Sequence, residues 1–192
     1  MHRTIDVKHP MNVAACPAFA PVDGQRLRQS DRDRVWAHLM TLSPSDRQSR
    51  FGYAISDDAL ARWVDSWDWE AQWLWHPHGP SDPVVALLQL APVGDGRWEM
   101  GLSVSPIARG QGWGRVLRDQ GLQWARRQRN AGQFGEVILH GSSYNRALVR
   151  LCQGSLLTME QGEITARFQW ASDHAASTSS SNCLTGQRLE VA

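Results

Sequence analysis

The stretch that decides the fold runs from Trp98 to Gly114 and reads WEMGLSVSPIARGQGWG. Its first part, up to Val104, has the pattern of a β-strand, and apolar residues at helical spacing begin where the stretch ends. Three glycines separate these two elements: Gly110, Gly112 and Gly114. Without side chains there, backbone N–H groups can converge in front of the positive end of the helix. The stretch therefore has the form of a pyrophosphate-binding loop, although a glycine-rich helix entry also occurs as a simple structural turn.

Two other phosphate-binding motifs do not fit these residues. A dinucleotide-binding GxGxxG motif would use Gly110 and Gly112, but Arg115 stands where the third glycine is required. That motif also needs an acidic residue at the end of a second strand roughly 20 residues further on, and none closes such a strand. The P-loop needs a lysine, which this stretch lacks. The glycines therefore form either a different kind of phosphate site or a structural turn.

The rest of the chain alternates between strand and helix patterns. Four helices are expected, the first after Ser30 and ending before Ser43, the second after Asp57, and the others over residues 112–129 and 145–153. After an initial strand, further strands are expected over residues 71–75, 84–91, 98–104, 136–140, 156–160 and 164–170, with tight turns at Asp95-Gly96 and Gln161-Gly162. This order predicts an α/β fold with a mixed, mostly antiparallel central sheet and helices on both faces.

Length and composition limit the possible functions. The 192 residues fit one domain, over residues 25–170, between flexible segments 1–24 and 171–192 that lack sustained periodicity. The net charge is +1 with no dense basic run, which argues against nucleic-acid binding. We see neither a signal peptide nor a membrane span, and the three widely spaced cysteines form no disulfide framework or zinc motif. We therefore expect a cytoplasmic protein that contacts no membrane and holds no metal.

At this point the residues resemble a known family. Arg109-Gly-Gln-Gly-Trp-Gly114 is similar to the Q/R-x-x-G-x-G/A signature of the GNAT N-acetyltransferase superfamily, and the strand end Leu102-Ser-Val-Ser-Pro106 precedes it as in that family. The segment 140–151 is similar to the family's second motif, with Asn145 six positions before a leucine. The resemblance covers residues 25–170. It implies a GNAT-like fold whose fourth and fifth strands splay apart to admit acetyl-CoA.

A second likeness concerns the beginning of the domain. The stretches Leu27-Arg-Gln-Ser-Asp-Arg32 and Leu42-Ser-Pro-Ser-Asp-Arg47 look like the first two helices of catalytic domains in bacterial protein-lysine acetyltransferases. The resemblance as a whole implies direct attack of a primary amine on the thioester of acetyl-CoA. The acceptor would be a small-molecule amine or a protein lysine, and the enzyme a monomer or homodimer.

The family resemblance also assigns cofactor-binding roles. Backbone N–H groups would hold the pyrophosphate at Gly110, Gln111, Gly112, Trp113 and Gly114, and Arg109 would add charge. The backbone edges of Leu102 and Val104, two residues apart and so facing the same side, would pair with the pantetheine arm like an added strand. Asn145 would bond to the pantetheine, and it can cap a helix at the same time.

The catalytic assignment is less complete. Glu99 occupies the position from which a glutamate in many relatives deprotonates the amine; otherwise it is an ordinary carboxylate facing solvent. The tyrosine that commonly serves as the acid is replaced by Cys152, and Tyr144 could substitute for it. The family's usual Gly-aromatic pair is also absent, with Gly154-Ser-Leu-Leu157 in its place. These departures keep open a non-catalytic acyl-CoA-binding or interaction module on the same fold.

Other candidate sites are weaker. His76 and His78 stand in a Pro/Gly-rich segment without a third ligand, so we expect loop surface there. Cys152 with His140 lacks an orienting third group for thiol catalysis, and we expect the cysteine to be a buried small hydrophobe. Core packing, with some contribution to an acceptor cleft, is expected of a tryptophan series comprising Trp63, Trp67, Trp69, Trp73 and Trp75.

Overall fold

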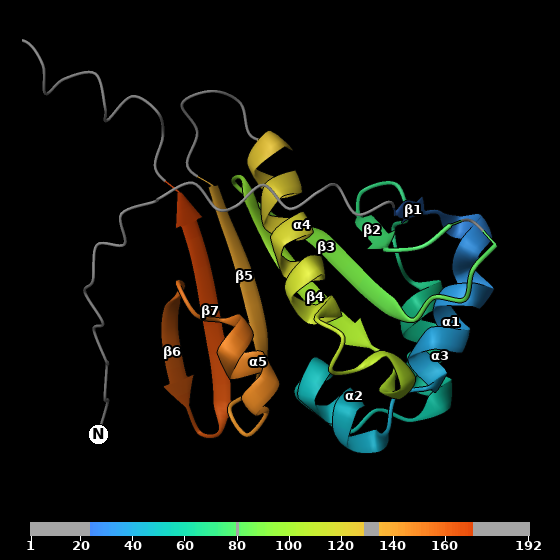
Figure 1. The fold of residues 1–192 in the computed structure, drawn as a ribbon, viewed down its shortest axis with the longest axis horizontal. Helices are drawn as coiled ribbons and strands as arrows, with labels where there is room; N and C mark the ends of the chain where they lie inside the picture. Colours follow the sequence, from blue (N-terminus) through green and yellow to red (C-terminus); the bar gives the residue numbers. More distant parts are fainter. Residues whose placement is uncertain (1–23, 80, 129–134, 171–192) are drawn as a thin grey trace, which may run out of the picture.

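A computed structural model describes residues 24–79, 81–128 and 135–170 (Figure 1). The predicted flexible segments lie outside the described residues, apart from Gly24, as does Arg129 at the end of a predicted helix. The described chain forms one seven-stranded sheet in the order β1-β2-β3-β4-β5-β7-β6. Only β4 and β5 run parallel, so the predicted mixed, mostly antiparallel sheet is confirmed.

The elements follow the predicted order with one addition. The strands are β1 Gln25–Leu27, β2 Trp73–His76, β3 Ala86–Gly94, β4 Arg97–Val104, β5 Gly135–Ser142, β6 Leu156–Glu160 and β7 Glu163–Trp170. The helices are α1 Arg32–Met40, α2 Pro44–Phe51, α3 Asp57–Asp65, α4 Trp113–Gln128 and α5 Arg146–Leu151, with short 3₁₀ turns η1 Gln29–Asp31 and η2 Pro106–Ala108. Helix α2 is the element that the periodicity did not predict.

Local sequence explains where these elements begin and turn. Asp95 and Gly96 both have positive φ and close the β3–β4 hairpin, and a second such pair closes the β6–β7 hairpin. The Ser56 hydroxyl caps α3 by accepting a hydrogen bond from the amide of Ala59. The predicted cap at Ser30 is wrong, because Ser30 lies inside η1 and α1 starts only at Arg32.

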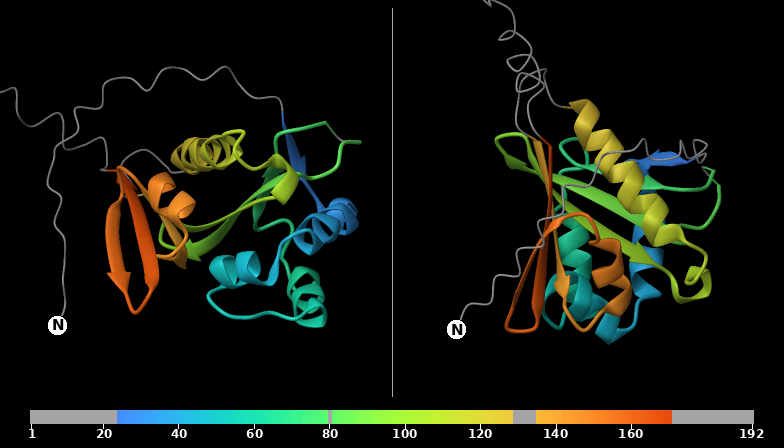
Figure 2. Two further views of the ribbon diagram at one scale, coloured as in Figure 1. Left: turned by 60° about the horizontal axis from the view of Figure 1, so that its bottom comes forward. Right: turned by 60° about the vertical axis from the view of Figure 1, so that its left-hand side comes forward.

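Helices cover both faces of the sheet, and each face has its own core (Figure 2). Helix α4 packs on one face, where β3 contributes Leu88 and Leu90. Helices α1 and α3 pack on the other face, where β3 contributes Leu87. Because alternate residues of a strand point to opposite faces, the leucine run of β3 serves both cores.

The parallel pair β4 and β5 separates part of the way along its length. Residues are paired only from Arg97 opposite Glu136 to Glu99 opposite Ile138. Beyond Glu99, β4 continues beside β3 and β5 continues beside β7, so the two strands diverge toward the lower part of Figure 1. Helix α2 packs against both strands on one face of this opening. The splayed strands that the family resemblance implies are therefore present.

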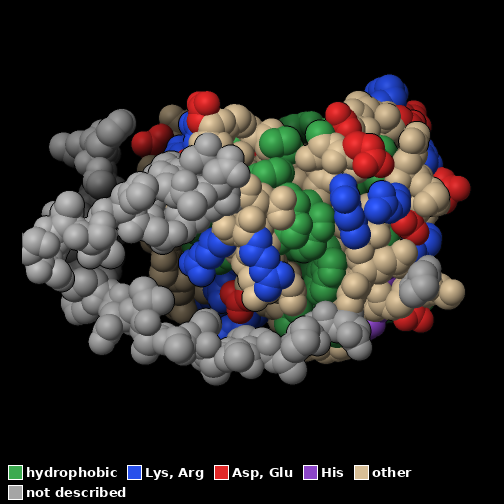
Figure 3. Space-filling model, turned by 90° about the horizontal axis from the view of Figure 1, so that it is seen from above, with side chains coloured by type: hydrophobic (Ala, Val, Ile, Leu, Met, Phe, Trp, Pro, Cys, Tyr) green, Lys and Arg blue, Asp and Glu red, His purple; other side chains and the backbone are tan. Residues whose placement is uncertain are grey.

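The surface carries charges of both signs. Viewed from above, hydrophobic side chains gather at the centre of the face, and basic and acidic side chains border them (Figure 3). Among the described residues, no helix is both long enough and apolar enough to cross a membrane.

Candidate active site

An open cleft of about 1500 Å³ follows the gap between β4 and β5. Its lining comes from α2, α3, β3, β4, the glycine loop before α4, β5, α5 and the β6–β7 turn. One end therefore lies at the glycine loop and the other lies between α2 and α3. The sheet is interrupted along the cleft, so backbone groups of β4 and β5 that would otherwise pair are left facing it.

The hydrogen-bond pattern identifies which backbone groups of β4 face the gap. The amide of Ser105 donates to the carbonyl of Val85 at 2.8 Å, and successive residues of an antiparallel strand alternate between bonding to that neighbour and facing away. Leu102 and Val104 are therefore the residues whose N–H and C=O groups face away from β3. The Val104 carbonyl confirms this direction, since it accepts a hydrogen bond from Arg109 Nε instead. Apart from this carbonyl, the predicted pair forms a free strand edge along the gap.

The glycine loop presents a row of unpartnered amides at the end of this edge. The N–H groups of residues 110–114 donate no hydrogen bond to any of the described residues. Gly110 and Gly112 have φ of +76° and +85°, and a Cβ added at either would meet nothing within 4 Å. The open space therefore lies directly over the loop, and the first turn of α4 behind it contributes positive potential.

Gly114 has a different role. A Cβ added there would lie 3.0 Å from a methyl carbon of Leu151, so glycine allows α4 to approach α5 closely. Two of the three glycines thus shape the loop, and the third sets the packing of the helices on either side of the gap.

Arg109 is partly neutralised by a neighbour that the sequence did not reveal. Its Nη2 lies 2.8 Å from Asp46 Oδ2, and Asp46 belongs to the capping box that begins α2 at Ser43. Partial burial alone raises the pKa of Asp46, but hydrogen bonds from Arg109 and Ser43 outweigh that effect and the pKa lies below its usual value. Arg109 therefore ties the glycine loop to α2.

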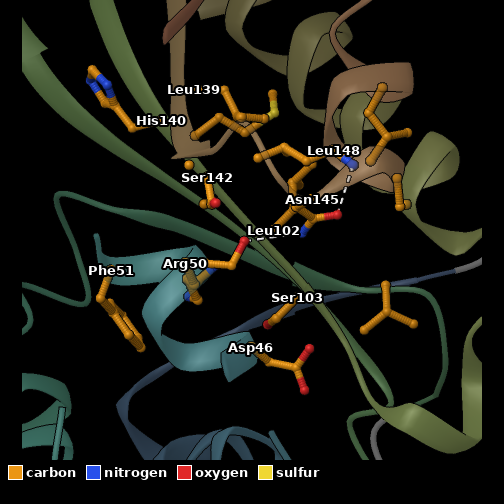
Figure 4. Close-up of a pocket in the computed structure, with 18 of the residues that line it drawn as sticks. Asp46, Arg50, Phe51, Leu102, Ser103, Leu139, His140, Ser142, Asn145 and Leu148 are labelled. Atoms are coloured by element: carbon orange, nitrogen blue, oxygen red, sulfur yellow. Dashed lines mark hydrogen bonds between the residues drawn. The ribbon is translucent and has the colours of Figure 1, made fainter. Parts of the chain in front are cut away.

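Asn145 links the two sides of the gap. Its Oδ1 accepts a hydrogen bond from the Leu148 amide at 3.1 Å and caps α5, while its Nδ2 donates to Ser49 Oγ of α2 at 3.0 Å. Figure 4 shows it at the end of β5, between α5 and α2. The capping role is confirmed; a contact with pantetheine stays a prediction.

The side chains of β4 divide between the two faces of the sheet. Met100, Leu102 and Val104 belong to or pack against the core beneath α4. Glu99, Gly101 and Ser103 alternate with them and therefore face α1 and α2. Figure 4 shows Leu102 and Ser103 on opposite sides of the strand. Glu99 is exposed and lines the cleft just where β4 and β5 part.

Arg50 of α2 is a cleft residue that the sequence reasoning missed. Its Nη2 donates to Gln89 Oε1 at 2.9 Å, whereas Nε and Nη1 are buried without a partner among the described residues. Burial lowers the pKa of Arg50 to about 10, and the charge of Glu99 opposes this effect. The serine–proline start of α2 and its aspartate could have revealed the helix as a capping box, but no apolar pattern marked its inward face.

A polar network beneath Ser103 involves the buried His38 of α1. His38 Nδ1 lies 2.8 Å from the Val84 carbonyl, which can only accept, so Nδ1 carries the proton. Nε2 then accepts from the Ser103 hydroxyl at 2.8 Å. Burial, together with the nearby charge of Arg50, lowers the pKa of His38 to about 4. His38 is therefore neutral at pH 7 and fixes the orientation of Ser103.

The structure corrects the prediction for the histidine pair. His76 ends β2 opposite Gln25 of β1 and is fully buried, so it is not loop surface. The sequence reasoning failed here because it did not foresee that β1 would extend the pairing to His76. His78 is partly buried and its ring lies 5.2 Å from that of Trp113. The described residues contain no group of three His, Cys, Asp or Glu side chains suited to a metal ion.

Cys152 and His140 do not form a site. Cys152 is fully buried in the core under α4, and burial raises the pKa of its thiol to about 11 despite the opposing charge of Arg118. His140 is exposed, bonds to Thr165 and points away from the other labelled residues in Figure 4. Tyr144 is 85% exposed and lines the cleft, so its hydroxyl remains available there, as does that of Tyr53.

The tryptophan series is largely core, as predicted. Trp67, Trp69 and Trp75 are buried. Trp63 and Trp73 are partly buried, and Trp63 also lines the cleft beside Phe51, with ring centroids 4.8 Å apart.

Comparisons with solved structures show the same fold. The GNAT domain of S. lividans PAT superimposes with a TM-score of 0.61 and 15% identity, covering 77% of this chain and 89% of that domain. Ribosomal-protein-alanine N-acetyltransferase from Brucella melitensis gives 0.56 and 15%, covering 78% and 99%. Spermidine N-acetyltransferase from Vibrio cholerae, in complex with CoA and spermine, gives 0.55 and 15%, covering 78% and 95%.

Sequence comparison identifies the family. No curated protein matches the chain. The sequence model of the acetyltransferase (GNAT) family matches residues 34–154, which is more than half of the chain and includes the glycine loop, the free edge of β4 and the α5 motif. With the splayed strands and the unpartnered loop amides at these positions, the chain belongs to the acetyltransferase (GNAT) family.

Proposed function

We propose that this protein is an acetyl-CoA-dependent N-acetyltransferase that acetylates a primary amine. The observation that carries the proposal is the continuity of the cleft. A free strand edge at Leu102 and Val104 leads directly to a loop of unpartnered amides over residues 110–114. A molecule with an extended amide chain that ends in a pyrophosphate could form hydrogen bonds with both the strand edge and the loop amides.

The residues present fit CoA. The N–H groups of Gly110, Gln111, Gly112, Trp113 and Gly114 are donors without partners in the described chain, and they would hold the pyrophosphate. The N–H and C=O groups of Leu102 and the N–H group of Val104 would hold the pantetheine, as an added strand does at a sheet edge, while the Val104 carbonyl already accepts from Arg109. Bound acetyl-CoA supplies the activated acetyl thioester.

Glu99 is the residue that we assign to proton removal. An alkyl amine with a pKa near 10 is almost wholly protonated at pH 7, so it needs a base before it can act as a nucleophile. Glu99 is the carboxylate on β4 at the point where the strands part, and it is open to the cleft. It would accept the proton from the amine directly or through one water molecule.

The buried thiol of Cys152 supports the alternative proposal of a non-catalytic acyl-CoA-binding module. A thiol with a raised pKa inside the core cannot reach the cleft as an acid. We favour the enzyme because Tyr144 lines the cleft and because a thiolate is a fair leaving group even without an acid.

The test is thiol release from acetyl-CoA, measured with a panel of amino acids, polyamines, aminoglycosides and lysine peptides. The expected result is amine-dependent release with a product heavier by one acetyl group. CoA binding without release for any amine would contradict the enzyme and favour the binding module. Failure to bind CoA at millimolar concentration would contradict both.

A further inference from the structure

We infer that the acceptor amine carries a carboxylate, as a free amino acid does, and that Arg50 binds this carboxylate. The inference rests on the proposed function and names the substrate class of the same cleft. Within the described part of the chain, Arg50 has unpaired N–H donors, and Glu99 lies close to it in the same cleft.

The guanidinium of Arg50 has an unfilled edge. Arginine has five N–H donors arranged as a planar fork, and each of its two edges combines one N–H of Nη2 with an N–H of Nε or Nη1. Gln89 takes one N–H of Nη2, while Nε and Nη1 have no partner among the described residues. One complete edge is therefore free, and a carboxylate is the group that fills such an edge with two hydrogen bonds.

A structural role does not account for this arrangement. Arg47, one turn earlier on α2, is buried and forms an ion pair with Asp57. Arg50 has Glu99 as a nearby opposite charge but, among the described residues, only the neutral Gln89 as a hydrogen-bond partner, and leaving its other donors buried and unpaired costs free energy. A ligand that supplies the missing acceptor would recover this free energy on binding.

The residues next to Arg50 extend the set of donors. Gln89 Oε1 accepts from Arg50, and Gln89 Nε2 in turn donates to Gln72 Oε1 at 2.7 Å. Each amide oxygen thus accepts one hydrogen bond, and the NH₂ group of Gln72 remains as a donor. Gln72 lines the cleft as well. This corner of the cleft therefore offers donors to an anion.

Gly101 places the guanidinium against β4. A Cβ at position 101 would lie 2.8 Å from Nη2 and 2.9 Å from Nη1 of Arg50, so only glycine leaves this space. Glu99 lies two residues earlier on the same face of the strand, which is about 7 Å away along the backbone. A zwitterion can thus place its amine at Glu99 and its carboxylate at Arg50.

The other walls of this corner suit an amino acid better than a polyamine. Phe51 and Trp63 form an aromatic wall, and the Arg50 guanidinium lies 5.5 Å from the Phe51 ring centroid. A polyamine would bring further positive charges close to a buried arginine, which is unfavourable at low effective dielectric constant. We therefore expect an apolar or aromatic amino acid.

The experiment compares matched acceptors. Thiol release from acetyl-CoA is measured with leucine, methionine and phenylalanine and with their carboxamides, which keep the amine and side chain but lose the negative charge. The wild type is expected to prefer each acid by about 10- to 100-fold in kcat/KM, mainly through KM, as for a hydrogen-bonded ion pair. Amides have the less basic amine, so unassisted chemistry favours them and the preference must come from the protein.

Variants then assign the preference to Arg50. In Arg50→Gln the preference for acid over amide should fall to within about twofold. Arg50→Lys keeps the positive charge but loses the two-pronged guanidinium edge, so it should retain only part of the preference. Arg150→Gln removes an exposed cleft arginine and is expected to keep the preference. Thermal unfolding of each variant establishes that it folds.

A binding measurement separates failure of this inference from failure of the proposed function. With CoA-saturated protein, the acids and not the amides should raise the melting temperature of wild type, and neither should do so in Arg50→Gln. Equal use of acid and amide by wild type, or an undiminished preference in Arg50→Gln, overturns the inference and leaves the acetyltransferase intact. If no amine releases thiol, the proposed function fails, and the binding measurement alone decides whether a carboxylate binds at Arg50.

Discussion

The two faces of β4 differ in what they offer to a ligand. On the α4 face, Met100, Leu102 and Val104 point into an apolar core, and the strand contributes only its backbone edge to the cleft. On the α1–α2 face, Glu99 and Ser103 meet buried or cleft-lining polar groups, including His38 and Arg50. We propose from this difference that backbone groups bind the acyl carrier, whereas side chains recognise the acceptor. Changes on the two faces should therefore have separable effects.

The largest effect is expected at Glu99. Glu99→Gln keeps the shape of the side chain but cannot take a proton, so the rate at pH 7 should fall by roughly 10²- to 10⁴-fold while CoA affinity persists. The loss should shrink as pH rises, because more of the amine then arrives deprotonated. Turnover against pH and a CoA titration measure the two parts.

Glu70→Gln, a change of an exposed carboxylate that pairs only weakly with Arg28, is the control and should keep the wild-type rate. Wild-type turnover of Glu99→Gln at pH 7 would remove this residue from the mechanism, provided that chemistry limits the rate. A variant that is inactive at every pH but binds CoA would assign Glu99 to positioning the acceptor.

The polar α1–α2 face should also make stability depend on pH. In the unfolded chain a histidine takes up a proton near pH 6.5, whereas burial lowers the pKa of His38 to about 4. Between these values only the unfolded state gains the proton, so stability from His38 is complete above pH 6.5 and falls by ~3 kcal/mol as pH drops to 4. Burial and the charge of Arg34 also lower the pKa of His76 to about 4, so His76 should add to this loss of stability.

Urea unfolding at pH 7 and pH 4.5 tests this expectation. The loss of stability should be smaller in His38→Gln than in wild type, and unchanged in His140→Gln, because His140 is exposed. Equal pH dependence in all three proteins would show that the His38 network does not exclude protons.

A smaller effect is expected at Arg109. Its guanidinium is about half exposed and already pairs with Asp46, so Arg109→Ala should weaken CoA binding by only about 2- to 5-fold. Asp46→Asn frees the arginine and should leave CoA affinity unchanged or slightly raised. A 100-fold loss of CoA affinity in Arg109→Ala would mean that side chains also hold the phosphates. That result would contradict the proposed division between backbone and side-chain recognition.

The difference between the faces also explains what the sequence could predict. The glycine loop can be recognised in the sequence because only glycine leaves the backbone N–H groups open to a ligand. Both hairpin turns are predicted for similar conformational reasons. Helix α2 escaped the periodicity because its inward residues Arg47 and Arg50 are polar, so no apolar stripe marks it. The stretch from Leu42 to Arg47 looks like the second helix of bacterial protein-lysine acetyltransferase domains, and this likeness indicates where α2 begins.

Long-range pairing accounts for what could not be predicted. The separation of β4 from β5 after Glu99 depends on the neighbours of each strand, and only the family resemblance implied it. The contact of Arg50 with Gln89, and of Arg109 with Asp46, joins residues far apart in the chain whose individual patterns carry no signal.

A calorimetric titration of CoA into wild type, Gly112→Asp and Gly94→Asp tests whether backbone amides of the glycine loop bind CoA. Gly112 and Gly94 have φ of +85° and +91°, and each has open space where a Cβ would stand, so both variants should carry similar backbone strain. Only Gly112→Asp places a carboxylate in the loop where phosphate must approach. We expect one CoA site in wild type and Gly94→Asp, and an affinity about 100-fold lower or lost in Gly112→Asp. Equal affinity in all three proteins would contradict this expectation.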